Sequence, residues 1–189
     1  AITMLSVLPS VGASWVALQI LSKARVQRSH LIVGGILVGL GIGTMHYSGM
    51  AAMRMAPMLR YEPFTFFLSI VLAVVLATVA LWIRFRLHRT RLTLLQRVVI
   101  SGIVLGLAIS GMHYTGMAAM RMAATIHYDP WWVAASVAIA IGASVIALRL
   151  AFHTTSVVQR AAAGIVMGAA ISGMHYAAMQ GSSFLPVEF

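Results

Sequence analysis

The sequence has 189 residues, of which 61% are hydrophobic and only 8% are charged. Soluble domains are about 25% charged, so this composition excludes an ordinary soluble protein and predicts an integral membrane protein. A net charge of +10 would suggest nucleic-acid binding in a soluble chain, but here the basic residues gather in particular loops. Because the chain has no cysteine, disulfides and thiolate metal sites are excluded.

Apolar segments of about 20 residues recur along the chain, and each is long enough to cross a hydrocarbon core of about 30 Å. In chain order they are Ile2–Leu21, Leu31–Met53, Phe64–Ile83, Val98–Met122, Trp131–Leu150 and Ala161–Met179. Little sequence is left between them for a soluble domain. We therefore expect an all-α membrane protein with six transmembrane helices, forming a single membrane domain over residues 1–189.

The charged residues predict which way the segments run. Most of the basic residues gather at the links after the first, third and fifth segments. They are Lys23, Arg25 and Arg28, then Arg84, Arg86, Arg89, Arg91 and Arg97, and finally Arg149 and Arg160, which bracket the third of these links. The positive-inside rule places these loops in the cytoplasm and the N-terminus outside. The three acidic residues, Glu62, Asp129 and Glu188, then fall on the outer side.

The chain contains three similar units, each made of two helices. Their second helices align as GGILVGLGIGTMHYSGMAAMRM around His46, SGIVLGLAISGMHYTGMAAMRM around His113 and AAGIVMGAAISGMHYAAMQGSS around His175. Their first helices share ASWVAL at 13–18, ATVALW at 77–82 and ASVIAL at 143–148. The repeats therefore cover approximately 1–62, 63–129 and 130–189. Because all three run in the same direction, we expect a pseudo-threefold arrangement about an axis along the membrane normal.

Small residues precede each of these histidines at four-residue spacing. They are Gly35, Gly39 and Gly43, then Gly102, Gly106 and Ser110, then Gly164, Gly168 and Ser172. This small-xxx-small pattern lets helix backbones approach closely in lipid, so we interpret it as a packing signal.

Each repeat carries one histidine with methionines close to it in the sequence. A histidine inside a bilayer is costly and usually faces the bundle interior, where it marks function. On a helix, His46, Met50 and Met53 form one stripe, as do His113, Met117 and Met120, whereas the third copy keeps only His175 and Met179. Met45, Met112 and Met174 directly precede the histidines. We expect the three histidines to meet in the outer leaflet, with the site weighted towards the first two copies.

The ligand types in this cluster favour copper. Thioether sulfur is a soft ligand that prefers Cu(I), and imidazole suits copper in both oxidation states. Zinc, calcium and magnesium fit less well without thiolates or carboxylates. A haem held by two of the histidines remains an alternative. The nine candidate metal ligands are His46, His113, His175, Met45, Met50, Met112, Met117, Met174 and Met179.

Tyrosines and a second short motif complete the pattern. Tyr47, Tyr114 and Tyr176 follow the histidines and are candidates for tuning a bound cofactor or for anchoring at the membrane interface. Tyr61-Glu62-Pro63 and Tyr128-Asp129-Pro130 lie beyond the first two motifs. We expect Arg54 to pair with Glu62 and Arg121 with Asp129. His127 lies beside this rim and is a candidate accessory ligand.

The segments MHYSGM at 45–50, MHYTGM at 112–117 and MHYAAM at 174–179 resemble the signature motifs of the bacterial MHYT sensor domain, over nearly the whole chain. The resemblance implies a sensor in the bacterial inner membrane that holds copper through Met, His and Tyr and detects oxygen, carbon monoxide or nitric oxide. It also implies a cytoplasmic effector, such as a diguanylate cyclase, phosphodiesterase or histidine kinase. We interpret this chain as the sensor portion of such a protein.

The residues leave several functions open. The leading hypothesis is a sensory input module in the lipid bilayer, responding to a gas or to redox state, either as a monomer or as a homodimer. A metal or small-molecule transporter or channel is the alternative, although apart from Arg149 at the end of the fifth segment no ionisable residue falls in the inner half of any segment. A catalytic role is disfavoured because the membrane segments offer no nucleophile with a neighbouring base and no pair of carboxylates.

Overall fold

The computed structural model describes residues 5–21, 25–52, 60–86, 90–121, 124–152 and 156–186, and the statements below concern these residues. Most of them belong to six helices. These are α2 (Val7–Leu21), α3 (Arg28–Ala52), α4 (Pro63–Arg86), α5 (Leu94–Ala118), α6 (Pro130–Phe152) and α7 (Val157–Gln180).

Five of these helices, α3 to α7, are long and apolar enough to cross a membrane. Helix α2 has 15 residues, and the first part of its predicted segment lies outside the described residues. At the arginine-rich end, α3 to α7 continue beyond the predicted apolar segments, whereas α2 ends at the predicted Leu21. Long basic side chains permit this extension, because they can keep their charge in water while their stems cover apolar surface. The predicted segment 98–122 is too long at its other end, since α5 stops at Ala118.

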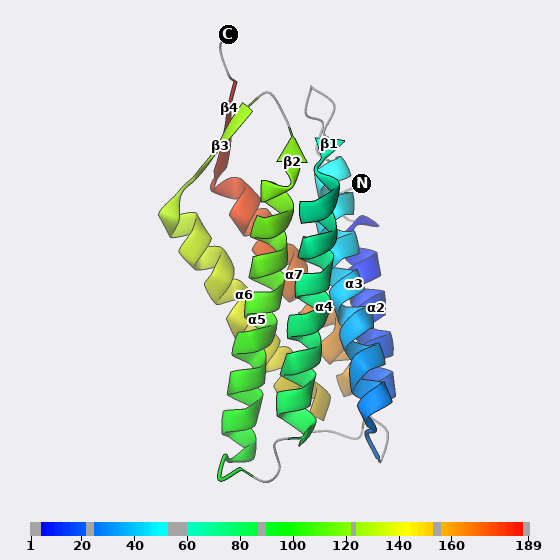
Figure 1. Cartoon of the computed structure of the whole chain (residues 1–189). Coiled ribbons are helices and arrows are strands. Elements are labelled where there is room, and N and C mark those ends of the chain that lie inside the picture. Colours follow the sequence, from blue (N-terminus) through cyan, green and yellow to red (C-terminus); the bar gives the residue numbers. More distant parts are fainter. Residues whose placement is uncertain are drawn as a thin grey trace.

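The helices pack as a closed ring in chain order, with α2 also against α7 (Figure 1). The second helices of the three repeats, α3, α5 and α7, contact one another as well and so form an inner layer. The first helices, α2, α4 and α6, lie between them on the outside. Residues on the inward face of α3, α5 and α7 therefore meet at the centre of the bundle.

The small-residue ladder joins each inner helix to the first helix of the following repeat. A Cβ added to Gly106 would lie 2.6 Å from the Cα of Ile141, so only glycine permits this approach of α5 to α6. The three equivalent pairs are Gly39 with Val74, Gly106 with Ile141, and Gly168 with Val11. The ladder thus closes the ring between repeats, with the third repeat packed on the first.

These contacts also correct the alignment of the outer helices. Since Val11, Val74 and Ile141 occupy equivalent places, ASWVAL at 13–18 corresponds to LATVAL at 76–81, one residue earlier than the segment ATVALW. The new register aligns small alanines that are all buried, and each is followed by a buried leucine. The pairs are Ala17 and Leu18, Ala80 and Leu81, and Ala147 and Leu148.

The all-α prediction missed four short strands, which lie together at one end of the bundle (Figure 1). β1 (Arg60–Tyr61) pairs antiparallel with β2 (Met120–Arg121). β3 (Ala124–Tyr128) pairs antiparallel with β4 (Ser182–Pro186). Backbone groups beyond the helix ends still need hydrogen-bond partners when they are covered, and pairing between these connections supplies them. These strands have only two to five residues, too few to show the alternating pattern of apolar and polar residues by which a strand is predicted.

The repeated Tyr-acid-Pro motifs begin helices. The carboxylate of Glu62 accepts hydrogen bonds from the backbone N–H groups of Phe64 and Thr65, and that of Asp129 accepts one from Trp131. Proline at the first helical position suits this arrangement, because its missing N–H would have no partner there. Capping therefore explains both acidic residues.

The surroundings of Glu62 include an arginine other than the predicted one. Hydrogen bonds from Thr65 lower the pKa of Glu62, with further help from the charge of Arg121. Arg121 thus acts on Glu62, across the β1–β2 pair, and its pairing with Asp129 stays a prediction. Arg54 lies outside the described residues.

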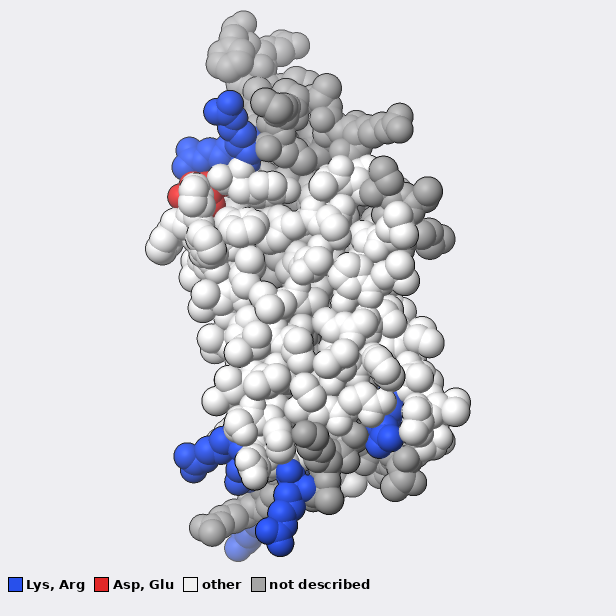
Figure 2. Space-filling view, turned by 90° about the vertical axis from the view of Figure 1, so that its right-hand side faces the viewer, with Lys and Arg blue, Asp and Glu red and all other residues white. Residues whose placement is uncertain are grey.

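The surface separates into an apolar band and charged ends (Figure 2). Large apolar side chains such as Phe67, Val71 and Trp82 are exposed along the helices, as expected for surface in contact with lipid. The end opposite the strands carries the described arginines that follow α2, α4 and α6 or lie at their ends. Lys23 and Arg89 lie outside the described residues.

Candidate metal centre

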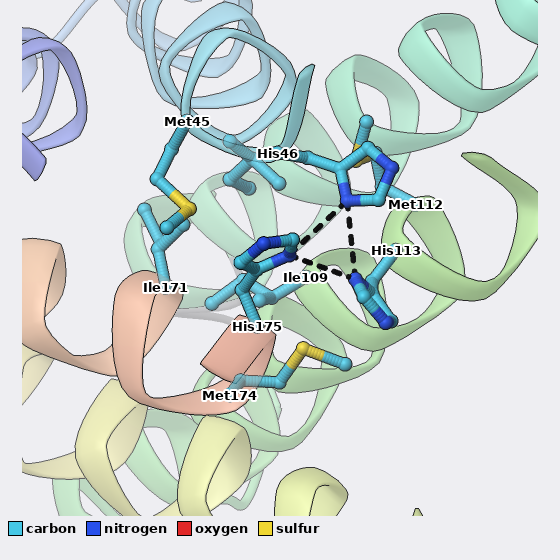
Figure 3. Close-up of a pocket in the computed structure, with 9 residues that line it drawn as sticks. Met45, His46, Ile109, Met112, His113, Ile171, Met174 and His175 are labelled. Carbon is cyan, nitrogen blue, oxygen red and sulfur yellow. Dashed lines mark hydrogen bonds between the residues drawn. The ribbon is translucent and has the colours of Figure 1, made fainter. Parts of the chain in front are cut away.

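Three histidines from three different helices meet at the centre of the bundle. His46 of α3, His113 of α5 and His175 of α7 are each only 2% exposed. Their Nδ1 atoms are 3.1 Å apart between His46 and His113, 3.3 Å between His46 and His175, and 3.2 Å between His113 and His175 (Figure 3). The inner layer brings together residues separated by more than 60 positions in the chain.

This triangle has the dimensions and chemistry of a metal site. Two nitrogens that each lie about 2.0 Å from a tetrahedral ion are roughly 3.3 Å apart, which matches the observed separations. The three Nδ1 atoms cannot satisfy one another by hydrogen bonding, since each carries either one hydrogen or one lone pair. A shared cation would bind all three lone pairs at once. The buried histidines can therefore hold a metal ion.

The other ring nitrogens point away from the triangle. The Nε2 atoms of all three histidines are buried and have no hydrogen-bond partner. A Cβ added to Gly116 would lie 2.6 Å from Nε2 of His46, and one added to Gly49 would lie 2.9 Å from Nε2 of His175. Glycine three residues after the histidine thus makes room for the ring of a neighbouring repeat. In the third repeat this position is Ala178.

A small cavity adjoins the histidines on the side towards the arginine-rich end. Its volume is about 10 Å³, room for roughly one water-sized atom. Three sets of equivalent residues line it, and Figure 3 draws all of them as sticks: Ile42, Ile109 and Ile171; Met45, Met112 and Met174; and the three histidines. The thioethers next to the histidines are therefore those that directly precede them in sequence.

The methionines that follow the histidines by four residues lie elsewhere. Met50 and Met117 are fully buried in a separate cluster with Met120, and Met179 packs against it. The predicted stripe of histidine and later methionines thus divides into two layers. Each inner helix contacts the two other inner helices, so residues from more than one side of the helix face the centre of the bundle. Met45 and its equivalents therefore also reach the cavity. Met53, Met55 and Met122 lie outside the described residues.

The motif tyrosines turn outwards, to the seams between repeats. The hydroxyl of Tyr47 lies 2.7 Å from the Ser69 hydroxyl of α4. Tyr114 is 2.9 Å from Ser136 of α6, and Tyr176 is 3.0 Å from Ser6. The Ser69 hydroxyl donates to the carbonyl of Phe66, so Tyr47 is the donor to Ser69. The tyrosine hydroxyls are thus directed to serines of the following repeat.

Each tyrosine ring nevertheless contacts the histidine beside it. The ring centroids of His46 and Tyr47 are 4.8 Å apart, those of His113 and Tyr114 are 4.9 Å apart, and those of His175 and Tyr176 are 5.0 Å apart. All three pairs meet edge to face, the arrangement that aromatic rings prefer. The tyrosines therefore link the histidine layer to the outer helices.

We predicted that the first two repeats would contribute more to the site than the third. The structure shows a difference between the repeats in the residues around the histidines, whereas the three histidines themselves are arranged almost equally. The three Nδ1 separations are nearly equal, and Met45, Met112 and Met174 are all fully buried. The third copy differs where Met179 is only partly buried and where Ala178 replaces glycine. His127 is exposed on β3 and pairs with Ser183, away from the triangle.

The fold and site define a helical bundle of membrane-spanning length with a buried group of three histidines supplied by three repeats. Sequence comparison identifies the family: the family described as "MHYT: Bacterial signalling protein N terminal repeat" matches residues 39–97 and 106–164. The chain therefore belongs to the MHYT family of bacterial signalling proteins, which confirms the resemblance. Each matched segment contains a motif tyrosine together with its serine partner on the next helix.

Several curated relatives are signalling proteins. The chain is 38% identical over 95% of its length to the bifunctional diguanylate cyclase/cyclic di-GMP phosphodiesterase MucR of Pseudomonas aeruginosa, covering 27% of that protein. It is 30% identical, again over 95%, to the signalling protein YkoW of Bacillus subtilis, covering 23% of it. It is 36% identical over 63% to the cyclic di-GMP phosphodiesterase NbdA of Pseudomonas aeruginosa, covering 15%. The chain thus spans about a quarter or less of these relatives, and no solved structure matches it.

Some residues of the site were missed by sequence reasoning. The isoleucines four positions before the histidines line the cavity, but they look like ordinary apolar residues in a membrane segment. Ser6, Ser69 and Ser136 hold the tyrosines, and the one-residue error in the outer-helix alignment hid their equivalence. Gly49 and Gly116 occupy the same position in the first two motifs, MHYSG and MHYTG. This repetition is the sequence feature that could have identified them as part of the site.

Proposed function

We propose that this chain is the membrane-embedded sensory input domain of a bacterial signalling protein, with a copper ion held by His46, His113 and His175 near the outer face. The observation that carries the proposal is the buried triangle of Nδ1 atoms at 3.1–3.3 Å. Copper is favoured over other metals because thioethers of Met45, Met112 and Met174 share the cavity, and soft sulfur with imidazole suits Cu(I).

The cavity argues for an ion and against a haem between the histidines. Haem would need two imidazoles on opposite faces of a wide planar ring, whereas the space available is about 10 Å³. Copper, when bound, supplies one-electron chemistry and affinity for diatomic gases. The role of the protein is to hold the ion in a dry apolar setting, with isoleucine and methionine side chains restricting what can approach it.

A signal can arise from the tightness of this cavity. The cavity has room for roughly one water-sized atom, so a diatomic ligand such as oxygen, carbon monoxide or nitric oxide on a bound ion would favour a packing in which the isoleucine and methionine side chains have moved apart. A ligand shifts an equilibrium only by its different affinity for two states, and the tight and expanded packings supply such a difference. Edge-to-face contacts from each histidine to its tyrosine would carry the change to the outer helices.

We further propose six membrane spans arranged about an approximate threefold axis, with the strand-bearing end outside the cytoplasmic membrane. Support comes from the three equivalent Tyr–Ser seams and from the arginines gathered at the opposite end, which the positive-inside rule assigns to the cytoplasm. That end would contact the cytoplasmic effector. By analogy with MucR and NbdA, cyclic di-GMP synthesis or hydrolysis is the output we propose.

Transport is less well supported by the same structure. Below the histidines the centre of the bundle is lined by Ile42, Ile109 and Ile171, and further on by Val38, Leu105 and Met167. Apart from the hydroxyl of Ser14, these layers offer a hydrated ion no polar side chain, so its passage is costly. The histidine layer is therefore better suited to holding an ion than to passing it.

Elemental analysis of the purified protein in lipid nanodiscs tests the copper site. Protein reconstituted with copper and washed should retain about one ion per chain, and the triple variant His46→Ala, His113→Ala, His175→Ala should retain none. His127→Ala, an exposed histidine away from the triangle, is the matched control and should behave as the parent. Equal copper in the parent and in a folded triple variant would refute the proposed site.

The sensory role has its own test. This chain can replace the matched segment of MucR, and the cellular cyclic di-GMP concentration can be followed while nitric oxide or oxygen is varied. The chimera should respond, and the triple histidine variant should not. A response of unchanged size in the variant would show that the histidines do not carry the signal.

A further inference from the structure

A polar cavity of about 360 Å³ lies at the strand-bearing end, apart from the histidine triangle. The start of α6, the end of α7 and the β3–β4 pair surround it, and Figure 1 shows these elements together. Its volume is within the range of small-molecule sites, about 300–1,000 Å³, and is far more than one metal ion fills. The side chains that the argument below uses are those of His127, Asp129, Trp132, Ser182 and Ser183.

The backbone fixes one wall of this cavity. The N–H of Asp129 donates to the carbonyl of Gly181 at 2.9 Å, which ties the start of α6 to the end of α7. Trp132 packs directly on Gly181, because a Cβ added to that glycine would overlap Cβ of Trp132. The φ of Gly181 is −88°, a negative value that other residues also adopt. The approach of Trp132 therefore requires glycine at this position, and it holds the indole against the cavity.

An equivalent place exists between α4, α5 and the β1–β2 pair. There the N–H of Glu62 donates to the carbonyl of Ala119 at 2.7 Å, as that of Asp129 does to Gly181. Both acids also cap the helix that follows them. Glu62 and Asp129 thus hold equivalent positions, and the first place serves as an internal comparison for the cavity.

At the first place the chain itself supplies a hydroxyl and a positive charge to the acid. The carboxylate of Glu62 accepts a hydrogen bond from the hydroxyl of Thr65, and the charge of Arg121 acts on it. Arg121 pairs with Arg60 across β1 and β2, so two arginines belong to this helix start. The needs of Glu62 are therefore met by side chains of the same chain.

At the cavity other residues replace these groups. Trp132 stands at the position of Thr65, and the strand register puts His127 and Ser183 at the positions of the two arginines. One oxygen of Asp129 caps α6, and the described residues that line the cavity include no lysine or arginine. A carboxylate thus borders open space at the place where the equivalent carboxylate meets an arginine.

We propose that this cavity binds a small organic cation, a primary ammonium or a guanidinium, whose charged group takes the place that Arg121 occupies at Glu62. Asp129 would accept charge-assisted hydrogen bonds from it, which are roughly twice as strong as neutral ones. The hydroxyl of Ser182 donates to the carbonyl of Ala178, so its oxygen is an acceptor for a ligand N–H. The indole of Trp132 would cover the apolar part of the ligand and attract its charge.

The same features disfavour other kinds of ligand. An anion would meet the carboxylate of Asp129, and the described lining offers it no lysine or arginine. A neutral polyol would use the hydroxyl groups of Ser182 and Ser183 but would gain nothing from the negative charge. Binding that depends on ligand charge therefore distinguishes the proposed cation from a neutral molecule. The proposal goes beyond the sensory role and needs no metal at the histidines.

Titration with butylammonium tests the proposal, using the protein labelled with fluorotryptophan in nanodiscs of zwitterionic lipid. The fluorine resonance of Trp132, assigned with Trp132→Phe, should shift saturably with butylammonium or butylguanidinium and stay unmoved with butanol or butyrate. Asp129→Asn removes the charge and keeps the cap, because asparagine caps helices as well as aspartate. Its affinity should fall by about tenfold, the loss expected for a charge-assisted hydrogen bond. The matched control is Glu62→Gln, at the equivalent acid, and it should bind as the parent does.

A second variant lets the chain fill its own site. Ser183→Arg restores the arginine found at the equivalent position 121, so binding of butylammonium should be lost. Ser156→Arg makes the same change at an exposed serine before α7, at the opposite end, and should bind normally. Binding of butanol as tight as that of butylammonium would refute the cation site, as would unchanged affinity in Asp129→Asn or Ser183→Arg. The triple histidine variant should bind butylammonium as the parent does, so failure of the copper site would leave this result intact.

Discussion

Tyr47 and Ser69 join two repeats by a hydrogen bond of 2.7 Å, although Tyr47 belongs to the inner helix of the first repeat and Ser69 to the outer helix of the second. The same pairing recurs at Tyr114 and Ser136, and Tyr176 with Ser6 closes the ring. The tyrosine of the motif thus holds two repeats together while its ring packs against the histidine. This arrangement places its hydroxyl away from the histidine triangle.

Removing this hydroxyl should lower stability without removing copper. We expect Tyr47→Phe to reduce the free energy of unfolding by about 0.5–1.5 kcal/mol, the usual value of one hydrogen bond. Ser69→Ala should have a similar effect, and the double variant should lose less than the sum of the two, as measured by thermal unfolding in micelles. Copper retention should stay at the parent level. A loss of copper in Tyr47→Phe equal to that of a histidine variant would instead make Tyr47 a ligand.

Crowding the ring of His46 should weaken metal binding. In Gly116→Ala, the new methyl group would lie 2.6 Å from Nε2 of His46, so the ring must shift and the triangle with it. We expect copper affinity to fall by about tenfold, comparable to the loss of a supporting contact in other metal sites. Competition with a chelator of known affinity measures this change.

Gly142→Ala provides the control for that prediction. Nothing lies within 4 Å of a Cβ added at Gly142, so this variant makes the same chemical change in a helix without crowding the site. Its copper affinity should equal that of the parent. Equal affinities for Gly116→Ala and Gly142→Ala would mean that the ring of His46 is not held in the position described.

In the small-residue ladder, a larger residue should destabilise the fold at position 106 and have little effect at position 43. Alanine at position 106 would place a Cβ 2.6 Å from the Cα of Ile141, and overpacking of this kind costs about 1–3 kcal/mol. At Gly43 the nearest atom is Ile70 Cγ1 at 3.6 Å, an ordinary contact. Gly43→Ser should therefore be nearly neutral, as Ser110 and Ser172 at the equivalent positions suggest. Unfolding in denaturing detergent would show the difference, and equal losses would argue against the assigned seams.

The cap of α4 should depend on pH. Hydrogen bonds from Thr65 hold the pKa of Glu62 below its usual value. A lowered folded-state pKa stabilises the fold above the unfolded pKa of about 4.3, and this contribution is lost as the pH falls through the folded value. Glu62→Gln should thus unfold at a lower temperature than the parent at pH 7, with the two converging at acid pH. A difference that persisted at low pH would point to a cause other than the carboxylate charge.

The apolar membrane segments, the three repeats and the small-residue ladder could all be recognised in the sequence without a structure. The sequence also singled out the motif histidines. These features are local or periodic: an apolar run of membrane length, a spacing of four residues and a motif written three times can all be read along the chain. The family resemblance rested on the same motifs.

How these parts meet depends on the packing of the six helices against one another. The ladder could have packed α3 on α2, but close approach selects α4, because the glycines face Val74 and Thr78. The four-residue stripe predicted His46 with Met50, yet Met45 and Ile42 line the cavity, since an inner helix in contact with two others turns more than one face to the centre. The pairing of Tyr176 with Ser6 joins opposite ends of the chain, and such ring closure depends on all six helices at once.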